Sequence, residues 1–320
     1  MFVVIGTANI DLLVSGFDKM PVVMGDEFTT SSLVFCDEPL QMVLGGNGAN
    51  CAYVLAGLGA PTTLCSAGGA DELGRIVCGW LAAQGVDLTG VVQHRQAATA
   101  YTAIVSDRAL NRLAYHHPGA LAAYRAADLP TELLRQAKVV LATGYTIMPQ
   151  LRPLGFAEAL ATARQGGALT ALDIGPAIGR PAQLDELAPF LPVIDYCLAN
   201  RHELAVCTDE REIDRGAQRL LAAGAACVIV KQGADGALIY QPGQRAHVPA
   251  FRVEVHSTVG AGDAFNAGLL YARQQGDPLE EAVRFGNAVA ALVISSGAGI
   301  LGCPSLAHVH EFVRYAEQRD

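Results

Sequence analysis

Short, continuously apolar segments alternate with longer segments of helical period along most of the chain. An unbroken apolar segment bounded by turn residues is typical of a strand buried on both faces of a sheet. The longer segments repeat apolar residues three and four positions apart, the pattern of a helix with one buried face. The alternation predicts an α/β fold with a doubly wound, mostly parallel central sheet and helices on both faces. Strands are predicted over 2–6, 62–68, 138–144, 169–175, 195–200 and 227–233, and helices over 49–58, 72–84, 149–165, 209–223, 263–275 and 279–295.

Two regions interrupt this alternation, residues 11–40 and 91–117. Both are rich in β-forming residues and lack helical period. We expect their strands to form a small β-sheet lid over the carboxyl ends of the main strands, where open α/β sheets bind ligands. No repeat, low-complexity tract or linker divides the chain, so residues 1–320 are predicted to form a single domain with the lid inserted in it.

Composition and charge exclude several classes of protein. The chain has 320 residues, 51% hydrophobic and 17% charged, which is enough apolar material for a large core. A formal net charge of −9 with only three lysines argues against nucleic-acid binding, which requires a basic surface. No apolar segment approaches the roughly 18–20 residues of a membrane-spanning helix, and the N-terminus lacks the basic region of a signal peptide. We expect a cytoplasmic protein without nucleic-acid or membrane partners.

The strongest local signal is a glycine-rich turn that leads directly into a helical segment. At such a turn, the backbone N–H groups of Gly260, Ala261 and Gly262 can bind an anion, helped by the helix dipole. Asp263 follows at once, and a carboxylate beside an anion hole suits phosphoryl transfer, in which it accepts the proton of the attacking hydroxyl. The alternative is a tight turn with Asp263 as the N-cap of the helix.

A second glycine cluster, with Gly45, Gly46 and Asn50, opens the first predicted helix. Its backbone amides and the Asn50 amide suit a ligand with many hydroxyl groups, and the alternative is a flexible loop with an Asn cap. Asn9 and Asp11 are placed at the end of the first strand, where Asp11 either accepts hydroxyl protons or is a turn residue. No P-loop occurs, and no G-x-G-x-x-G follows the first predicted strand, so a dinucleotide-binding oxidoreductase lacks its main signature.

Together these clusters resemble the ribokinase-like, or PfkB, family of carbohydrate kinases. The resemblance covers essentially the whole chain, in order. The matching positions are Gly45, Gly46 and Asn50 for the first signature, Asn200 and Glu203 for N-x-x-E, Lys231, Gly233 and Gly236 for K-x-G-x-x-G, and Thr258, Gly260, Ala261, Gly262 and Asp263 for the second signature.

The resemblance implies transfer of a phosphoryl group from ATP to a hydroxyl of a small neutral sugar, with Mg²⁺ as cofactor. It makes Asp263 the catalytic base beside the anion hole. The family's substrate residues correspond to Asn9, Asp11, Gly45, Gly46 and Asn50, and its nucleotide residues to Asn200, Glu203, Lys231, Gly233, Gly236 and Asn287, of which Asn200 and Glu203 would hold Mg²⁺ largely through water.

The chain departs from the family pattern at two positions. Ser257 stands where the second signature begins with an Asp that helps to ligate potassium in some relatives. A neutral Ser is a poorer cation ligand, which leaves backbone carbonyls near Ala298, Ile300 and Ser305 as the candidates for a monovalent cation. Asn47 stands where ribokinases usually have Lys. This change argues against ribose and against a sugar phosphate, because an anionic acceptor normally needs a basic residue.

The resemblance also implies that the lid closes over the sugar and can pair with the lid of a second subunit. At its return to the main domain we expect Arg112 to be solvated, and His116 and His117 to have structural packing roles.

Two other functions remain open at this point. A nucleoside kinase of the same fold would need an aromatic slot for a base, which Phe28, Phe35 and Tyr101 of the lid could supply. A catalytically silent sugar-binding sensor is the other alternative.

Overall fold

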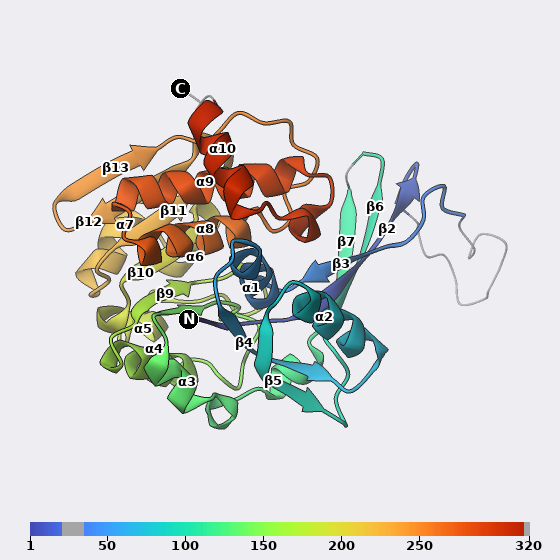
Figure 1. The fold of residues 1–320 in the computed structure, drawn as a ribbon, viewed down its shortest axis with the longest axis horizontal. Helices are drawn as coiled ribbons and strands as arrows, with labels where there is room; N and C mark the ends of the chain where they lie inside the picture. The colour runs from blue at the N-terminus through green and yellow to red at the C-terminus, as the bar shows by residue number, and fades with distance from the viewer. Residues whose placement is uncertain (21–34, 110, 317–320) are drawn as a thin grey trace.

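The computed structural model describes residues 1–20, 35–109 and 111–316, and within them the predicted α/β architecture is confirmed (Figure 1). The main sheet has nine strands in the order β13-β12-β11-β10-β9-β8-β1-β4-β5. From β5 to β11 all neighbours are parallel, and the hairpin of β12 and β13 adds two antiparallel strands at one edge. The strands are β1 (Phe2–Ile5), β4 (Thr62–Gly69), β5 (Asp87–His94), β8 (Val139–Ala142), β9 (Leu169–Asp173), β10 (Tyr196–Asn200), β11 (Val228–Lys231), β12 (Ala237–Gln241) and β13 (Gln244–Val248).

Helices cover both faces of this sheet, so the central strands are buried on both sides. Alternate residues of β1 show the arrangement: Phe2 and Val4 belong to one hydrophobic cluster, and Val3 and Ile5 belong to another. One face carries α1 (Asn47–Gly57), α2 (Glu72–Ala83), α8 (Ala261–Gln275), α9 (Leu279–Ser295) and α10 (Leu306–Tyr315), and the other carries α3 (Thr131–Gln136), α4 (Leu154–Gln165), α5 (Leu184–Leu187), α6 (Arg201–Thr208) and α7 (Ile213–Ala222).

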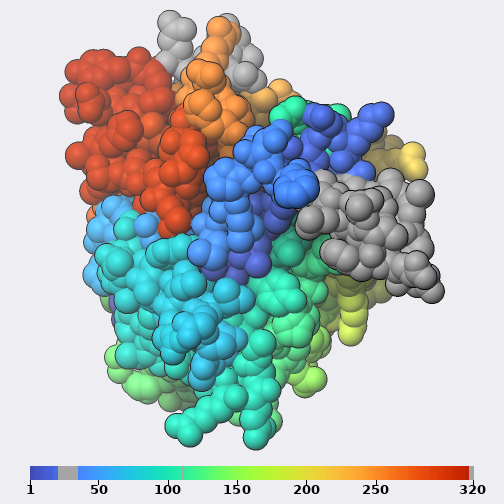
Figure 2. Space-filling view, turned by 90° about the vertical axis from the view of Figure 1, so that its right-hand side faces the viewer, coloured from blue at the N-terminus to red at the C-terminus, as the bar shows by residue number. Residues whose placement is uncertain are grey.

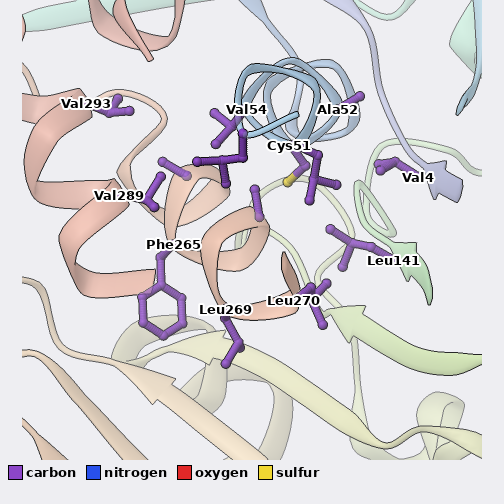
Figure 3. Close-up of a cluster of buried hydrophobic side chains, with 14 of the residues drawn as sticks. Val4, Cys51, Ala52, Val54, Leu141, Phe265, Leu269, Leu270, Val289 and Val293 are labelled. Carbon is purple, nitrogen blue, oxygen red and sulfur yellow. The ribbon is translucent and has the colours of Figure 1, made fainter. Parts of the chain in front are cut away.

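The core between α1, α8 and α9 fixes the helix that begins at the glycine-rich turn. Val54 of α1, Leu270 of α8 and Val289 of α9 are completely buried in one cluster (Figure 3). Val4 of β1 and Leu141 of β8 belong to the same cluster, and Figure 3 shows them on the strands beside these helices. Because α1 and α8 pack directly on each other, the two glycine clusters of the sequence come to adjacent helix starts.

A separate four-stranded sheet forms the lid, in the order β3-β2-β6-β7. β2 pairs antiparallel with β3 and parallel with β6, and β7 returns antiparallel along β6. In Figure 2 the blue lid segment lies beside the red C-terminal part of the chain, where β3 contacts the turn Gly299–Gly302. The four strands are β2 (Asn9–Phe17), β3 (Gln41–Gly45), β6 (Tyr101–Asp107) and β7 (Arg112–His117).

Several boundaries differ from the sequence prediction, each for a local reason. Residues 91–94 were assigned to the lid but belong to β5 at the edge of the main sheet, and β3 lies just beyond residue 40. The helix predicted from 149 begins only at Leu154, after Pro153, because a proline disfavours helical geometry at the residue before it. The helix predicted from 209 begins at Ile213, because Asp209 ends α6 with a left-handed φ of 54°. No helix of the described residues is long and apolar enough to cross a membrane.

Candidate active site

The N-terminus of α8 lies at the centre of the site, at the carboxyl ends of the main strands. Gly260 is its N-cap with a φ of 77°, a left-handed conformation that favours glycine, and a Cβ there would lie 2.5 Å from Ile300. The N–H of Ala261 points to the Thr258 carbonyl at 3.3 Å, and no described residue accepts from the N–H of Gly260 or Gly262. Asp263 is the third residue of α8, so the alternative that it is the N-cap is wrong.

The Asp263 carboxylate is held by two amide side chains from α1. Nδ2 of Asn47 donates to Oδ1 at 2.9 Å, and Nδ2 of Asn50 donates to Oδ2 at 2.8 Å. The side chain is buried, with 6% of the residue exposed, and this burial raises its pKa to about 6 although the two amides oppose the rise. Asn50 lies inside α1, whose N-cap is Gly46, so the alternative of an Asn cap is also wrong.

The lid supplies the next group of predicted residues. The prediction that Asn9 and Asp11 end the first strand is wrong. They lie at the start of β2 of the lid, because β1 stops at Ile5. Nδ2 of Asn9 donates to Oδ1 of Asp11 at 2.7 Å. Both side chains lie against Gly45, where an added Cβ would approach them within 2.7 Å. The glycine pair therefore brings the start of the lid close to the Asn47–Asp263 hydrogen bond.

A polar row crosses the lid sheet from Asp11. Asp11 is in register with Thr102, and Thr102 with His116, so the three side chains lie on one face. Oγ1 of Thr102 lies 3.2 Å from Nδ1 of His116. Burial and the neighbouring His117 lower the pKa of His116 below its usual range, which favours the neutral ring at pH 7. The register thus places His116 on the same face as Asp11. The ring of His117 packs against Tyr101, with 5.5 Å between the centroids.

Asn200 and Glu203 meet in a capping box at the start of α6. Oδ1 of Asn200 accepts from the Glu203 N–H at 2.9 Å, and Oε2 of Glu203 accepts from the Asn200 N–H at 2.7 Å. Burial and nearby Asp173 raise the pKa of Glu203 to about 7. One oxygen of each side chain is thus engaged with the backbone, which favours outer-sphere contact with a metal over direct ligation.

A cavity of about 500 Å³ connects the α8 turn with the ends of β10 and β11. Its polar lining includes Asn200, Glu203 and Lys231, together with Asp263. Its apolar lining comes from the 250–255 segment and from α9 (Ala250, Phe251, Val253, Val255, Ala290, Ala291 and Ile294), and Gly233, Gly236 and Asn287 also line the cavity. Nδ2 of Asn287 donates to the carbonyls of Val248 and Pro249, so this side chain fixes the backbone beside the cavity.

Asp173 is a residue of the site that the sequence analysis missed. It ends β9, is buried and lines the same cavity. Oδ2 of Asp173 accepts from Nζ of Lys231 at 2.7 Å and from Nδ2 of Asn266 at 2.5 Å, and its Oδ1 accepts from the Gly175 N–H. Its only sequence signal was its place at the end of a buried strand, where parallel strands present ligand-binding residues.

Other expectations are met in part. Arg112 is exposed, as predicted. Phe28 lies outside the described residues, Phe35 is 84% exposed, and Tyr101 is in register with buried Ile10 on the face opposite Asp11. The two described aromatic residues therefore provide no slot beside Asp11. Among the candidates for a monovalent cation, the Ile300 carbonyl already accepts from the Cys303 N–H at 3.0 Å.

The family model of the pfkB carbohydrate kinases matches residues 3–306, nearly the whole chain. The chain belongs to this family. The kinase is 28% identical to a ribokinase of Haemophilus influenzae over 98% of both chains. It is 26% identical to a 5-dehydro-2-deoxygluconokinase of Geobacillus thermodenitrificans, covering 85% of this chain and 84% of that protein. It is 27% identical to a nucleoside kinase of Methanothermobacter thermautotrophicus over 89% of both chains.

Solved structures agree on the fold. The kinase superposes on the Arabidopsis thaliana ribokinase complexed with ribose and ATP with a TM-score of 0.82, at 24% identity and over 98% of both chains. The ribokinase-like fold predicted from the sequence is therefore confirmed, and the chain is a carbohydrate kinase.

Proposed function

We propose that the kinase transfers the terminal phosphoryl group of ATP to a hydroxyl of a small neutral sugar, with Mg²⁺ as cofactor. The observation that carries this proposal is the Asp263 carboxylate, buried and held on both oxygens beside the N-terminus of α8. A base beside a set of backbone N–H groups is the arrangement that phosphoryl transfer to an alcohol requires.

In the proposed reaction, Asp263 accepts the proton of the sugar hydroxyl. The hydroxyl oxygen forms a bond to the terminal phosphorus while the bond from that phosphorus to the bridging oxygen breaks, and ADP leaves. The N–H groups of Gly260 and Gly262, with the dipole of α8, stabilise the charge on the phosphoryl oxygens. Ala261 contributes less than predicted, because its N–H already points to Thr258.

The residues of the cavity fit a hydrated Mg²⁺. Three carboxylates line it (Asp173, Glu203 and Asp263), against the one ammonium of Lys231, so the described part of the wall favours a cation. The described residues contain no cluster of three or more His, Cys, Asp and Glu that could hold a metal directly. Mg²⁺ usually keeps several waters and binds through substrate phosphates. Asn200 and Glu203 could therefore contact the ion through its waters. Bound Mg²⁺ supplies neutralisation of the phosphate charge.

A neutral, hydroxylated acceptor is supported by the side chains around Asp263. Asn9, Asn47 and Asn50 are uncharged, and Asp11 would repel an anionic acceptor. Oδ1 of Asn50 is buried and has no hydrogen-bond donor among the described residues. A buried acceptor without a partner is rare in a folded protein, and a sugar hydroxyl can satisfy it.

A nucleoside acceptor is the second candidate, favoured by the similarity to a nucleoside kinase. It is less well supported, because Phe35 and Tyr101 do not form a slot on the Asp11 face.

We also propose a cytoplasmic homodimer that forms through the lid. Strand register places Met42, Leu113 and Tyr115 on the lid face opposite Asp11, and they are 44%, 48% and 58% exposed. Exposed apolar side chains on one sheet face favour association with another surface. Sedimentation of the wild type and of a Tyr115→Glu variant tests this, with a dimer expected only for the wild type.

A coupled assay of ADP release tests the proposed function. The wild type is incubated with Mg·ATP and, separately, with pentoses, hexoses and nucleosides. Turnover that depends on a neutral sugar is the expected result. Turnover only with nucleosides supports the second candidate, and ATP binding without turnover on any acceptor contradicts both.

A further inference from the structure

The lid face that carries Asp11 has a polar row beside an apolar strip. The strand registers place Asp11, Thr102 and His116 opposite one another on β2, β6 and β7. Two positions farther along the strands, Leu13 and Ile104 are in register on the same face, and both are partly buried. The face therefore offers hydrogen-bonding groups next to apolar side chains, which match the hydroxyl and C–H groups of a sugar.

Hydrogen bonds connect the members of the polar row. Burial raises the pKa of Asp11, and hydrogen bonds from Thr102 and Asn9 to its carboxylate oppose the rise. Oγ1 of Thr102 also lies 3.2 Å from Nδ1 of His116. A hydroxyl has one proton, so when Thr102 donates it to Asp11, its oxygen accepts from the Nδ1–H of His116. This chain of hydrogen bonds fixes both the tautomer and the orientation of the ring.

The second ring nitrogen of His116 is left for a ligand. Among the residues that the structure describes, none hydrogen-bonds to its Nε2, and the residue is accessible from solvent. Burial and the neighbouring His117 lower the pKa of His116, so the ring is neutral at pH 7. With its proton on Nδ1, the neutral ring presents Nε2 as an acceptor, and a sugar hydroxyl is a suitable donor.

The row has one end near the proposed base and one end away from it. Asp11 lies against Gly45 of β3, and β3 leads into Asn47, which donates to Asp263. His116 lies on β7, the outer strand on the other side of the lid sheet. Neighbouring strands are about 4.8 Å apart, so the Cα atoms of Asp11 and His116 are separated by roughly 10 Å. A pentose or hexose can fill the space between the two side chains.

We infer that His116 binds a hydroxyl of the sugar other than the one that is phosphorylated, with Thr102 as the residue that positions its ring. The inference rests on the proposed function and sharpens it, because it places a determinant of acceptor choice on the lid. Asp11 and Nε2 of His116 then select a sugar whose hydroxyls have a fixed spacing. An acceptor that lacks the hydroxyl at His116 leaves Nε2 without its donor, which weakens binding.

Steady-state kinetics with deoxy sugars tests the inference. The probes are the neutral pentose or hexose with the highest kcat/KM in the ADP-release assay and its monodeoxy derivatives, each of which lacks one hydroxyl. The deciding variant is His116→Phe, which keeps a ring and removes both nitrogens. His117→Phe is the matched control, because the ring of His117 packs against Tyr101 on the other face of the same strand. Thr102→Val removes the positioning hydroxyl, Thr102→Ser retains one, and thermal unfolding checks that each variant is folded.

For the wild type, we expect one derivative, besides the one that lacks the reacting hydroxyl, to have a KM about 3- to 10-fold above that of the parent sugar, the loss of one hydrogen bond. His116→Phe should raise the KM of the parent sugar by a similar factor and use this derivative as well as the parent. The KM of ATP should stay within about twofold. Thr102→Val should lose part of the discrimination, and Thr102→Ser should keep it.

Two results overturn the inference. One is a His116→Phe variant that discriminates among the deoxy sugars as the wild type does. The other is an equal loss of discrimination in His117→Phe. If His116→Phe does not fold, discrimination that is unchanged in Thr102→Val overturns the inference instead. A wild type that turns over no neutral sugar overturns the proposed function, on which the inference rests.

Discussion

The two halves of the site differ in chemistry and in origin. Around the proposed acceptor position lie amides, with Asp11 as the added carboxylate, and they come from the lid and from α1. Around the proposed donor position lie Asp173, Glu203 and Lys231, which come from the ends of the main strands and the first turn of α6. Neutral amides can both donate to and accept from hydroxyls, whereas charged groups suit phosphates and a divalent cation. If the proposed function holds, the chemistry of each half is matched to one substrate.

Asp263 is shared by the two halves, and its loss should have the largest effect. We expect Asp263→Asn to lower kcat by roughly 10²–10⁴, because no other group in the described site is placed to accept the hydroxyl proton. Steady-state ADP release with the best acceptor measures this. Asp277→Asn, at the far end of α8, is a matched control that should keep wild-type activity. Persistence of activity in Asp263→Asn would remove the base assignment and leave the kinase assignment intact.

The same substitution should stabilise the fold at neutral pH. The pKa of Asp263 is about 6 in the folded protein against 3.8 for an ordinary Asp, so the folded state binds the proton more tightly than the unfolded state. Stability from this group is present below pH 4 and is lost as the pH rises through about 6. At pH 8 the charged form costs up to roughly 3 kcal/mol, at about 1.4 kcal/mol per pKa unit.

Denaturant unfolding at pH 8 and at pH 4 therefore separates activity from stability. The free energy of unfolding of Asp263→Asn should exceed that of the wild type at pH 8 and differ little from it at pH 4. Hydrogen bonds to Asn47 and Asn50 that the new amide cannot make reduce the gain. A variant that is equally destabilised at both pH values would show that the carboxylate is needed for the fold rather than held there for catalysis.

Asp11 tests whether the acceptor half acts separately from the donor half. Asp11→Ala should raise the KM of the acceptor about 10- to 100-fold, because a charged group that accepts hydrogen bonds from the sugar hydroxyls is lost, while the KM of ATP stays within about threefold. Asp18→Ala, which changes an exposed aspartate just beyond β2, is the control. Similar increases in both KM values would show that the two halves of the site do not act separately.

Features with a local sequence pattern could be predicted, whereas features that depend on distant contacts could not. The central strands were predictable because burial on both faces leaves a continuous apolar segment, and the residues of the α8 turn because a glycine-rich motif occupies consecutive positions. Strand β13 was missed because its sequence has mixed polarity at the edge of the sheet, and the sequence analysis also missed β12 although most of its residues are apolar and buried. Asp173 was missed because its partners lie 58 and 93 residues away, and no local pattern links them.

Asn47 shows a subtler failure of sequence reasoning. From the sequence, this residue mattered for the lysine that it replaces and for the substrates that it disfavours. The structure adds a contact that no spacing predicts, because Nδ2 of Asn47 donates to a carboxylate 216 residues later in the chain. The residue that varies from the ribokinase pattern therefore contacts the proposed catalytic base itself.

This contact gives the smallest expected effect, a shift in the pH dependence of catalysis. The base must be deprotonated, so kcat/KM should fall as the pH drops through about 6. Asn47→Leu removes a donor to the charged form, which should raise the pKa of Asp263 and move the acidic limb of the profile upward by about one pH unit. Asn47→Lys places a cation there and should move the limb to lower pH. The opposite order of the two variants, or an acidic limb that does not respond to either, would show that Asn47 acts on the sugar and not on the base.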